Sequence, residues 1–314
     1  MSRSDEATRQ RALDSYRIVD SLPEQAYDDI ARMAAMVLGA PTAFVSFIDR
    51  DRQWLKARQG FELSETPRSI AFCDHAIRNP TEMFEIPDAT RDPRFMRNPL
   101  VQVEGGIRFY AGMPLVTPGG AAIGTVCVVD QKPRKLDEAQ RGTLAALARL
   151  TMNLLEARHR ERELERQLLL LSPAVSGPGA AGAASHRTVA IFEVQDFAGA
   201  AARLGRGALE GYLDRLRKAF EAALRPASGD TVNRVSEAPE LIVVLHGTRE
   251  ETAEPLQQLG TLLGAFEHDS GLRVLCAYGS SEGANERIET VYLRADEALT
   301  LERDAYRAAL GTPV

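Results

Sequence analysis

The residues with the most distinctive chemistry in this chain are three cysteines, Cys73, Cys127 and Cys276, and a histidine, His75, close to the first of them. The cysteines are odd in number and widely spaced, and the second and third lie in apolar runs typical of strands. Neither a disulfide framework nor a zinc site is therefore indicated. Cys73 and His75 are two residues apart, which on a helix turns their side chains about 200° away from each other. We therefore expect no shared metal ion, and we expect Cys73 to pack as a small buried hydrophobic residue.

The segments that must position these residues begin with two helices, over residues 5–22 and 24–38. Gly39 stands where the second helix needs a left-handed residue at its end. Residues 41–49 alternate with the period of two that is typical of a strand, and a polar turn leads to a second arm that ends at Gly60. This arm carries Trp54, the only tryptophan, which we expect to anchor a core because of the apolar surface it buries.

An irregular stretch follows over residues 60–106, with a short helix over 69–78 that carries Cys73 and a strand over 83–87. Long irregular segments in compact domains are usually functional. A second hairpin comes next, IRFYAGMPLVTP and AAIGTVCVVDQ, with a turn at residues 118–120. This order predicts an α+β fold in which a mixed sheet has helices on one face and loops over the other.

A long helix is predicted over residues 136–171, because no proline interrupts this stretch. Its apolar positions repeat at spacings of three and four, the a/d pattern of a coiled coil, with Glu161 as the polar interruption. They are Leu147, Leu150, Leu154, Ala157, Leu164, Leu168 and Leu171. We expect a parallel helix pair and hence a homodimer, although packing of the helix on its own domain would suit residues 144–155. Residues 172–186, rich in Gly, Ala, Ser and Pro, predict a flexible linker.

The composition of the chain limits the kinds of protein that it can be. It has 314 residues, 44% hydrophobic and 26% charged, which is typical of a globular protein with room for two domains. Its net charge of −6, without a basic cluster on one face, argues against nucleic acid as a partner. The N-terminus is charged throughout and no apolar run approaches the length of a membrane span. We therefore expect a cytoplasmic protein that does not bind membranes.

A second domain is predicted over residues 187–314, with elements in the order βαββαβα. It opens with a buried strand over 188–195 and a helix over 197–224 that is interrupted near Gly205. TVNRVSE and LIVVLHG then form a predicted hairpin, and a helix over 250–266, the strand LRVLCAYGS and a helix over 288–310 complete the order. This order is typical of a ferredoxin-like palm with an added helix.

The first part of the chain, residues 1–157, resembles the GAF domain of bacterial signalling proteins. The segments that carry the resemblance are FVSFIDRDRQWLKARQGFELSETPRSIAFCDHAI, IPDATRDPRFMRNPLV, IRFYAGMPLVTPGGAAIGTVCVVDQKPR and LDEAQRGTLAALARL. GAF domains sense small ligands or serve as dimerisation platforms, with a pocket between the sheet and its irregular crossover. The resemblance implies that this pocket is walled by eight residues: Ser46, Trp54, Cys73, His75, Asp88, Phe109, Tyr110 and Met113.

The second part resembles the GGDEF domain, the diguanylate cyclase fold that makes cyclic di-GMP from two GTP molecules across a dimer. GDTVNRVSEAPELIVVLHG stands at the signature hairpin of that family. The resemblance places Glu193 at the metal-binding aspartate, and Glu237 and Glu240 in the signature, which reads EAPEL in this chain. Phosphoryl transfer needs carboxylates around magnesium and polar groups around the phosphates. Methyl groups replace the polar contacts to GTP at Ala198, Ala201 and Ala202. We therefore interpret the three glutamates as degenerate remnants, with no catalytic residue and no bound metal.

These resemblances predict a non-catalytic bacterial signalling protein. A GAF sensor and dimerisation module would be coupled by the helix to an inactive GGDEF-like domain that acts by protein contact or nucleotide binding. No cofactor is expected; the expected partners are a second copy of the chain, a small ligand in the GAF pocket and a protein of cyclic di-GMP signalling. One alternative is a weak diguanylate cyclase that uses Glu193 and Glu240. Another is a free methionine sulfoxide reductase, a GAF branch that uses paired cysteines.

Overall fold

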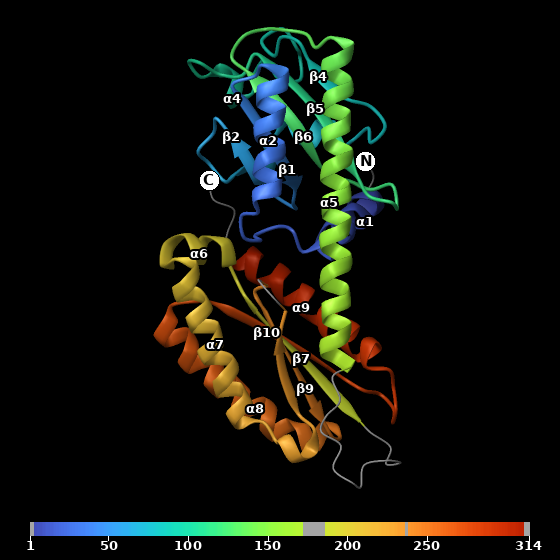
Figure 1. The fold of residues 1–314 in the computed structure, drawn as a ribbon, viewed down its shortest axis with the longest axis vertical. Coiled ribbons are helices and arrows are strands. Elements are labelled where there is room, and N and C mark those ends of the chain that lie inside the picture. The colour runs from blue at the N-terminus through green and yellow to red at the C-terminus, as the bar shows by residue number, and fades with distance from the viewer. Residues whose placement is uncertain (1–2, 172–185, 236–237, 311–314) are drawn as a thin grey trace. The chain divides into compact units, whose positions relative to one another are not determined.

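The computed structural model describes residues 3–171, 186–235 and 238–310 (Figure 1). It divides into two compact units, Met1–Arg160 and Glu161–Val314. Most of the predicted linker and Glu237 therefore lie outside the described residues. Within the described ranges, none of the helices combines the length and the apolar character that a membrane span needs.

The first unit is built on a six-stranded sheet in the order β3-β2-β1-β6-β5-β4. Its strands are β1 (Thr42–Ile48), β2 (Arg52–Gln59), β3 (Glu65–Pro67), β4 (Phe84–Ile86), β5 (Phe109–Val116) and β6 (Ala122–Asp130). The two predicted hairpins, β1–β2 and β5–β6, meet at the centre, where β1 pairs with β6. All the strand pairs described in this sheet are antiparallel, so the expectation of a mixed sheet is wrong. The reason is that hairpins supply most of the pairings, and a hairpin can only pair its arms antiparallel.

Three helices cover one face of this sheet, namely α1 (Arg3–Tyr16), α2 (Gln25–Leu38) and the first part of α5 (Glu138–Leu171) (Figure 1). The other face carries the short helices η1 (Arg68–Ile70), α3 (Phe72–Ala76) and α4 (Pro99–Gln102) with their loops. Gly39 ends α2 in the left-handed conformation, as predicted. The first helix is shorter than expected, because the chain turns through positive φ angles at Arg17 and Asp20.

The long helix α5 differs in burial along its length. Leu144, Leu147 and Leu155 are buried in the core beneath the sheet, so the first half packs on its own domain. Three other seam positions are more open, with exposed fractions of 54% at Leu150, 61% at Leu164 and 69% at Leu168. Such an apolar stripe on a helix is usually buried against another part of a protein.

The second unit has a four-stranded antiparallel sheet in the order β10-β7-β9-β8. Its elements are β7 (Arg187–Val194), α6 (Phe197–Leu204), α7 (Arg206–Ala223), η2 (Pro226–Ser228), β8 (Thr231–Arg234), β9 (Glu240–His246), α8 (Arg249–Ser270), β10 (Val274–Ser280) and α9 (Ile288–Leu310). The predicted βαββαβα order is present, and the predicted helix break lies at Gly205, where φ is +83°. The last residues of α5 belong to this unit, where Leu170 packs in the core under α9.

Candidate ligand-binding site

A cavity of about 230 Å³ lies on the loop-covered face of the first sheet. Its wall comes from β1 and β2, from α3, from the stretch of residues 100–107 and from the end of β6. Most of the lining side chains are apolar: Phe44, Leu55, Phe61, Phe72, Leu100, Val103, Ile107, Tyr110 and Val129. Apolar walls with a few polar groups are typical of small-molecule sites. The polar groups here include Gln53, Thr66, Asp130 and Gln131.

Residues 98–107 form the cover of this cavity, and specific local contacts hold them in place. The Asn98 side chain accepts a hydrogen bond from the Leu100 backbone at 2.9 Å, which caps α4, and donates one to the Ile70 carbonyl at 2.9 Å. Farther along, Gly106 packs so closely that a Cβ atom there would meet three backbone carbonyl oxygens at 2.7–2.8 Å. A side chain at this position would push the cover away from the sheet, because only glycine tolerates such an approach.

Two of the three cysteines meet beside the cavity, which the sequence did not predict. Cys73 on α3 and Cys127 on β6 are both buried, and their sulfur atoms are 3.6 Å apart. The Tyr110 hydroxyl donates a hydrogen bond to the Cys73 Sγ at 3.2 Å. Behind the thiols, the hydroxyls of Ser46 and Thr125 are 3.1 Å apart, on strand positions that pair directly. Thiols and hydroxyls thus form a buried polar cluster, with Cys73 and Tyr110 on the cavity wall.

The two thiols differ in acidity. Burial raises the pKa of Cys73, but hydrogen bonds from Cys127, Ser46, Thr125 and Tyr110 outweigh it and bring that pKa down to about 7. Burial, and the neighbouring Cys73, raise the pKa of Cys127 well above its usual range. A negative charge in this cluster therefore resides on Cys73, because that sulfur receives the hydrogen bonds.

Three other residues predicted for the wall, Ser46, His75 and Asp88, do not line this cavity. Ser46 belongs to the buried polar cluster, where its hydroxyl lies 3.1 Å from that of Thr125. His75 is half-buried on α3, edge-on to the Phe95 ring at 4.7 Å, and its pKa is lowered by burial and by the positive charge of Arg78. Asp88 shapes the crossover, since its carboxylate accepts hydrogen bonds from the Thr90 backbone and hydroxyl at 3.0 and 2.6 Å.

Trp54, Phe109 and Met113 lie instead on the helix-covered face, which corrects their expected place in the wall. Side chains alternate across a strand, so Phe109 and Tyr110 must point to opposite faces of β5, and only Tyr110 points to the cavity. Trp54 is buried near Phe47, with 6.4 Å between ring centroids, in the core role expected for it.

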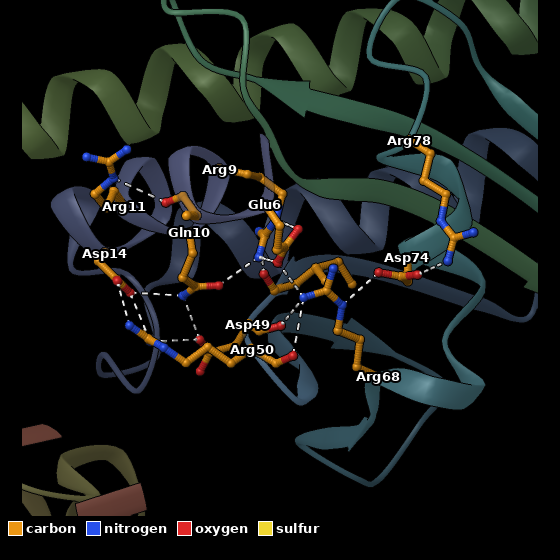
Figure 2. A network of polar contacts seen from close by, with 12 residues as sticks. Glu6, Arg9, Gln10, Arg11, Asp14, Asp49, Arg50, Arg68, Asp74 and Arg78 are labelled. Carbon is orange, nitrogen blue, oxygen red and sulfur yellow. Dashed lines mark hydrogen bonds and ion pairs between the residues drawn. The ribbon is translucent and has the colours of Figure 1, made fainter. Parts of the chain in front are cut away.

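A network of charged side chains joins α3, the helix that carries Cys73, to the N-terminal helix α1 (Figure 2). Arg68 donates to the Asp74 carboxylate on α3 at 2.7 Å and to the Glu6 carboxylate on α1 at 2.7 Å. Glu6 also accepts from Arg9, and Arg9 donates to the Ile48 carbonyl at the end of β1 at 2.6 Å. Asp74 is the next residue after Cys73, which lines the cavity, so the network includes a direct neighbour of a lining residue.

In the second unit, two of the three glutamates that the GGDEF resemblance singled out occupy paired positions on neighbouring strands. Glu193 on β7 pairs in register with Glu240 on β9, and both are buried. The Glu193 carboxylate accepts a hydrogen bond from the Gln195 amide at 3.0 Å and lies 3.3 Å from the Arg303 guanidinium of α9. Among the described residues, no group of three His, Cys, Asp or Glu side chains is placed to hold a metal ion.

Comparison with known proteins identifies the class of the first domain. Residues 22–155 match the family model of the GAF domain, and we conclude that this part of the chain is a GAF domain.

A curated relative shares the same part. The cyclic di-GMP phosphodiesterase PA2567 of Pseudomonas aeruginosa is 40% identical over 149 residues, which are 47% of this chain and 25% of that protein. The chain thus spans about a quarter of the length of this relative.

Two solved structures are also similar to this chain. The GAF domain of an Acinetobacter phosphoenolpyruvate-protein phosphotransferase has 16% identity and a TM-score of 0.37, over 52% of this chain and 99% of that one. A free methionine-R-sulfoxide reductase from Neisseria meningitidis has 18% identity and a TM-score of 0.36, over 43% of this chain and 78% of that one.

Proposed function

We propose that this chain is a non-catalytic signalling protein whose GAF domain binds a small, largely apolar ligand. The observation that carries the proposal is the cavity of about 230 Å³ with apolar walls and a few polar groups, inside a matched GAF domain. The relative that shares this domain is named a cyclic di-GMP phosphodiesterase, which supports a place in cyclic di-GMP signalling.

We further propose that the second unit is a degenerate GGDEF-like domain that acts by contact or by nucleotide binding. Its strand order and the register pair of Glu193 and Glu240 support the assignment. The Arg303 guanidinium beside Glu193 supports the loss of catalysis, because a resident cation already balances this carboxylate. The helix α6 presents only methyl groups at Ala198, Ala201 and Ala202.

A physical connection from the cavity to α5 supports signalling in the first unit. The Arg68 network ties α3 to α1. At the other end of α1, the Tyr16 hydroxyl donates to Glu156 on α5, and Arg158 donates to the Tyr16 carbonyl at 3.1 Å. A ligand that moves α3 would therefore act on α5 through packed and hydrogen-bonded elements.

The homodimer belongs to the same proposal. Leu150, Leu164 and Leu168 leave an apolar stripe exposed along α5, with the a/d spacing that a second copy of the helix would match. We propose that two chains cover this stripe in parallel.

Ligand binding is tested by thermal shift on the full chain with a panel of amino acids, nucleotides and small aromatic acids. A ligand at 100 times its Kd should stabilise the chain by about 2.7 kcal/mol. Phe61→Ala, which removes part of the cavity wall, should reduce the shift, whereas Met36→Ala, an exposed residue of α2, should not. A ligand that stabilises both variants equally binds elsewhere and contradicts the assignment of the cavity.

Catalysis is tested by GTP turnover with magnesium and with manganese. We expect no cyclic di-GMP from the wild type, nor from a variant that carries GGDEF in place of EAPEL. A further variant adds Lys, Asn and Asp at Ala198, Ala201 and Ala202, because contacts that act as a unit are not recovered singly. Clear product from the wild type would instead support the weak cyclase that uses Glu193 and Glu240.

A further inference from the structure

The geometry points to a second function for the cavity: Cys73 and Cys127 form a reversible peroxide-reactive dithiol, in which a small uncharged hydroperoxide converts the pair to a disulfide. This inference does not depend on the identity of the ligand proposed above. It rests on three observations, namely the contact between the two sulfur atoms, the place of Cys73 on the cavity wall and the hydrogen bond from Tyr110.

The distance between the thiols suits oxidation with little rearrangement. The sulfur atoms are 3.6 Å apart, and a disulfide bond is about 2.05 Å long, so they need to approach by about 1.5 Å. Cys73 lies on α3, a helix of five residues, and Cys127 lies on a central strand. Side-chain rotation and a small movement of this short helix are enough to close the gap.

The cavity selects the class of oxidant. Cys73 is 1% exposed, so an oxidant reaches it from the cavity and not from the outer surface. The walls are mainly apolar, which disfavours a charged oxidant because its desolvation would be costly. An uncharged hydroperoxide, either hydrogen peroxide or one with an apolar organic group, meets both conditions.

The order of the two steps follows from the acidity of the thiols. Cys73, with a pKa of about 7, is partly a thiolate at neutral pH, whereas Cys127 stays protonated. The Cys73 thiolate attacks the hydroperoxide: an S–O bond forms, the O–O bond breaks, and the alcohol or water leaves with the proton that the Cys73 thiol gave up. The sulfur of Cys127 then attacks the resulting sulfenic acid, so that the S–S bond forms, the S–O bond breaks and water leaves with the Cys127 proton. Two thiols and one hydroperoxide thus give one disulfide, one alcohol or water, and one further water.

Oxidation would change the cavity wall directly. The disulfide ties α3 to β6 and alters the sulfur that accepts the Tyr110 hydrogen bond. Because Asp74, the next residue, binds Arg68, the change also reaches the network that leads to α1.

The test uses the full reduced chain, treated at neutral pH with hydrogen peroxide or cumene hydroperoxide, then alkylated and mapped under non-reducing conditions. We expect a Cys73–Cys127 disulfide that dithiothreitol reverses. Cys127→Ser should accumulate a sulfenic acid on Cys73 that dimedone captures, and Cys73→Ser should abolish the fast reaction. Cys276→Ser, at the exposed cysteine of the second unit, is the matched control and should change nothing.

A second readout separates activation of Cys73 from a merely structural role. The oxidation rate of the wild type should rise with pH around a midpoint near 7, and Tyr110→Phe should move this midpoint upward because the thiolate loses a donor. A pair that stays reduced until denaturant is added would overturn the proposal, and the wild-type mapping shows this even if a variant fails to fold. An equal rate in Cys73→Ser, or oxidation by methionine sulfoxide but not by hydroperoxides, would also overturn it.

Discussion

Replacing Glu6 with Gln should weaken the first unit at neutral pH and should remove part of its sensitivity to acid. The Glu6 carboxylate accepts hydrogen bonds from Arg9 at 3.0 and 2.8 Å and from Arg68 at 2.7 Å. Burial raises the pKa of Glu6, but the hydrogen bonds and positive charges of the two arginines outweigh it and lower that pKa from 4.5 to about 2. A carboxyl whose pKa is lowered by folding stabilises the folded state only while it is charged.

The size of the effect follows from this difference. Lowering the pKa from 4.5 to about 2 corresponds to about 3.4 kcal/mol at full strength, at about 1.36 kcal/mol per pH unit. The Glu6 side chain is 32% exposed, so solvent screens the interaction, and we expect about 1–2 kcal/mol. This contribution is complete above about pH 5 and disappears as the pH falls towards 2.

The assay is urea denaturation followed by the fluorescence of Trp54, the only tryptophan, which is buried in the first unit. Wild type and Glu6→Gln are compared between about pH 7 and pH 3, with Glu62→Gln, an exposed residue, as the matched control. The difference in free energy of unfolding should be about 1–2 kcal/mol at pH 7 and should shrink steadily below pH 5. A difference that is the same at every pH, or no difference at all, would refute the linkage to the arginines.

Three further predictions concern the dimer and the two cores. Leu164→Glu should yield monomer in light scattering, whereas Leu301→Glu, at an exposed position of α9, should leave the dimer intact. Gly124→Ala should cost about 3 kcal/mol in the Trp54 transition, because its Cβ would lie 2.0 Å from a carbonyl oxygen of β1. Phe220→Ala should destabilise the second unit by about 3–5 kcal/mol in circular dichroism and leave the Trp54 transition unchanged, since its ring packs 4.7 Å from another phenylalanine ring of that unit.

The sequence by itself determined the elements whose causes are local. The left-handed end of α2 at Gly39, the helix break at Gly205 and the span of α9 over residues 288–310 all follow from residues close together in the chain. The alternation along residues 41–49 likewise predicted the strand β1. The GAF assignment rested on such segments in their order, and the family match over residues 22–155 confirms it.

Only the tertiary structure decided which face of the first sheet holds the cavity and which distant residues come into contact. A period of two shows that Phe109 and Tyr110 point to opposite faces, but the packing of α1, α2 and α5 on one face left the cavity to Tyr110. Cys73 and Cys127 are 54 positions apart, and no pattern within either segment shows that α3 lies over β6. Their contact exists because β1 pairs with β6 at the centre of the sheet and the crossover closes over that pair, and such long-range pairings depend on the whole chain.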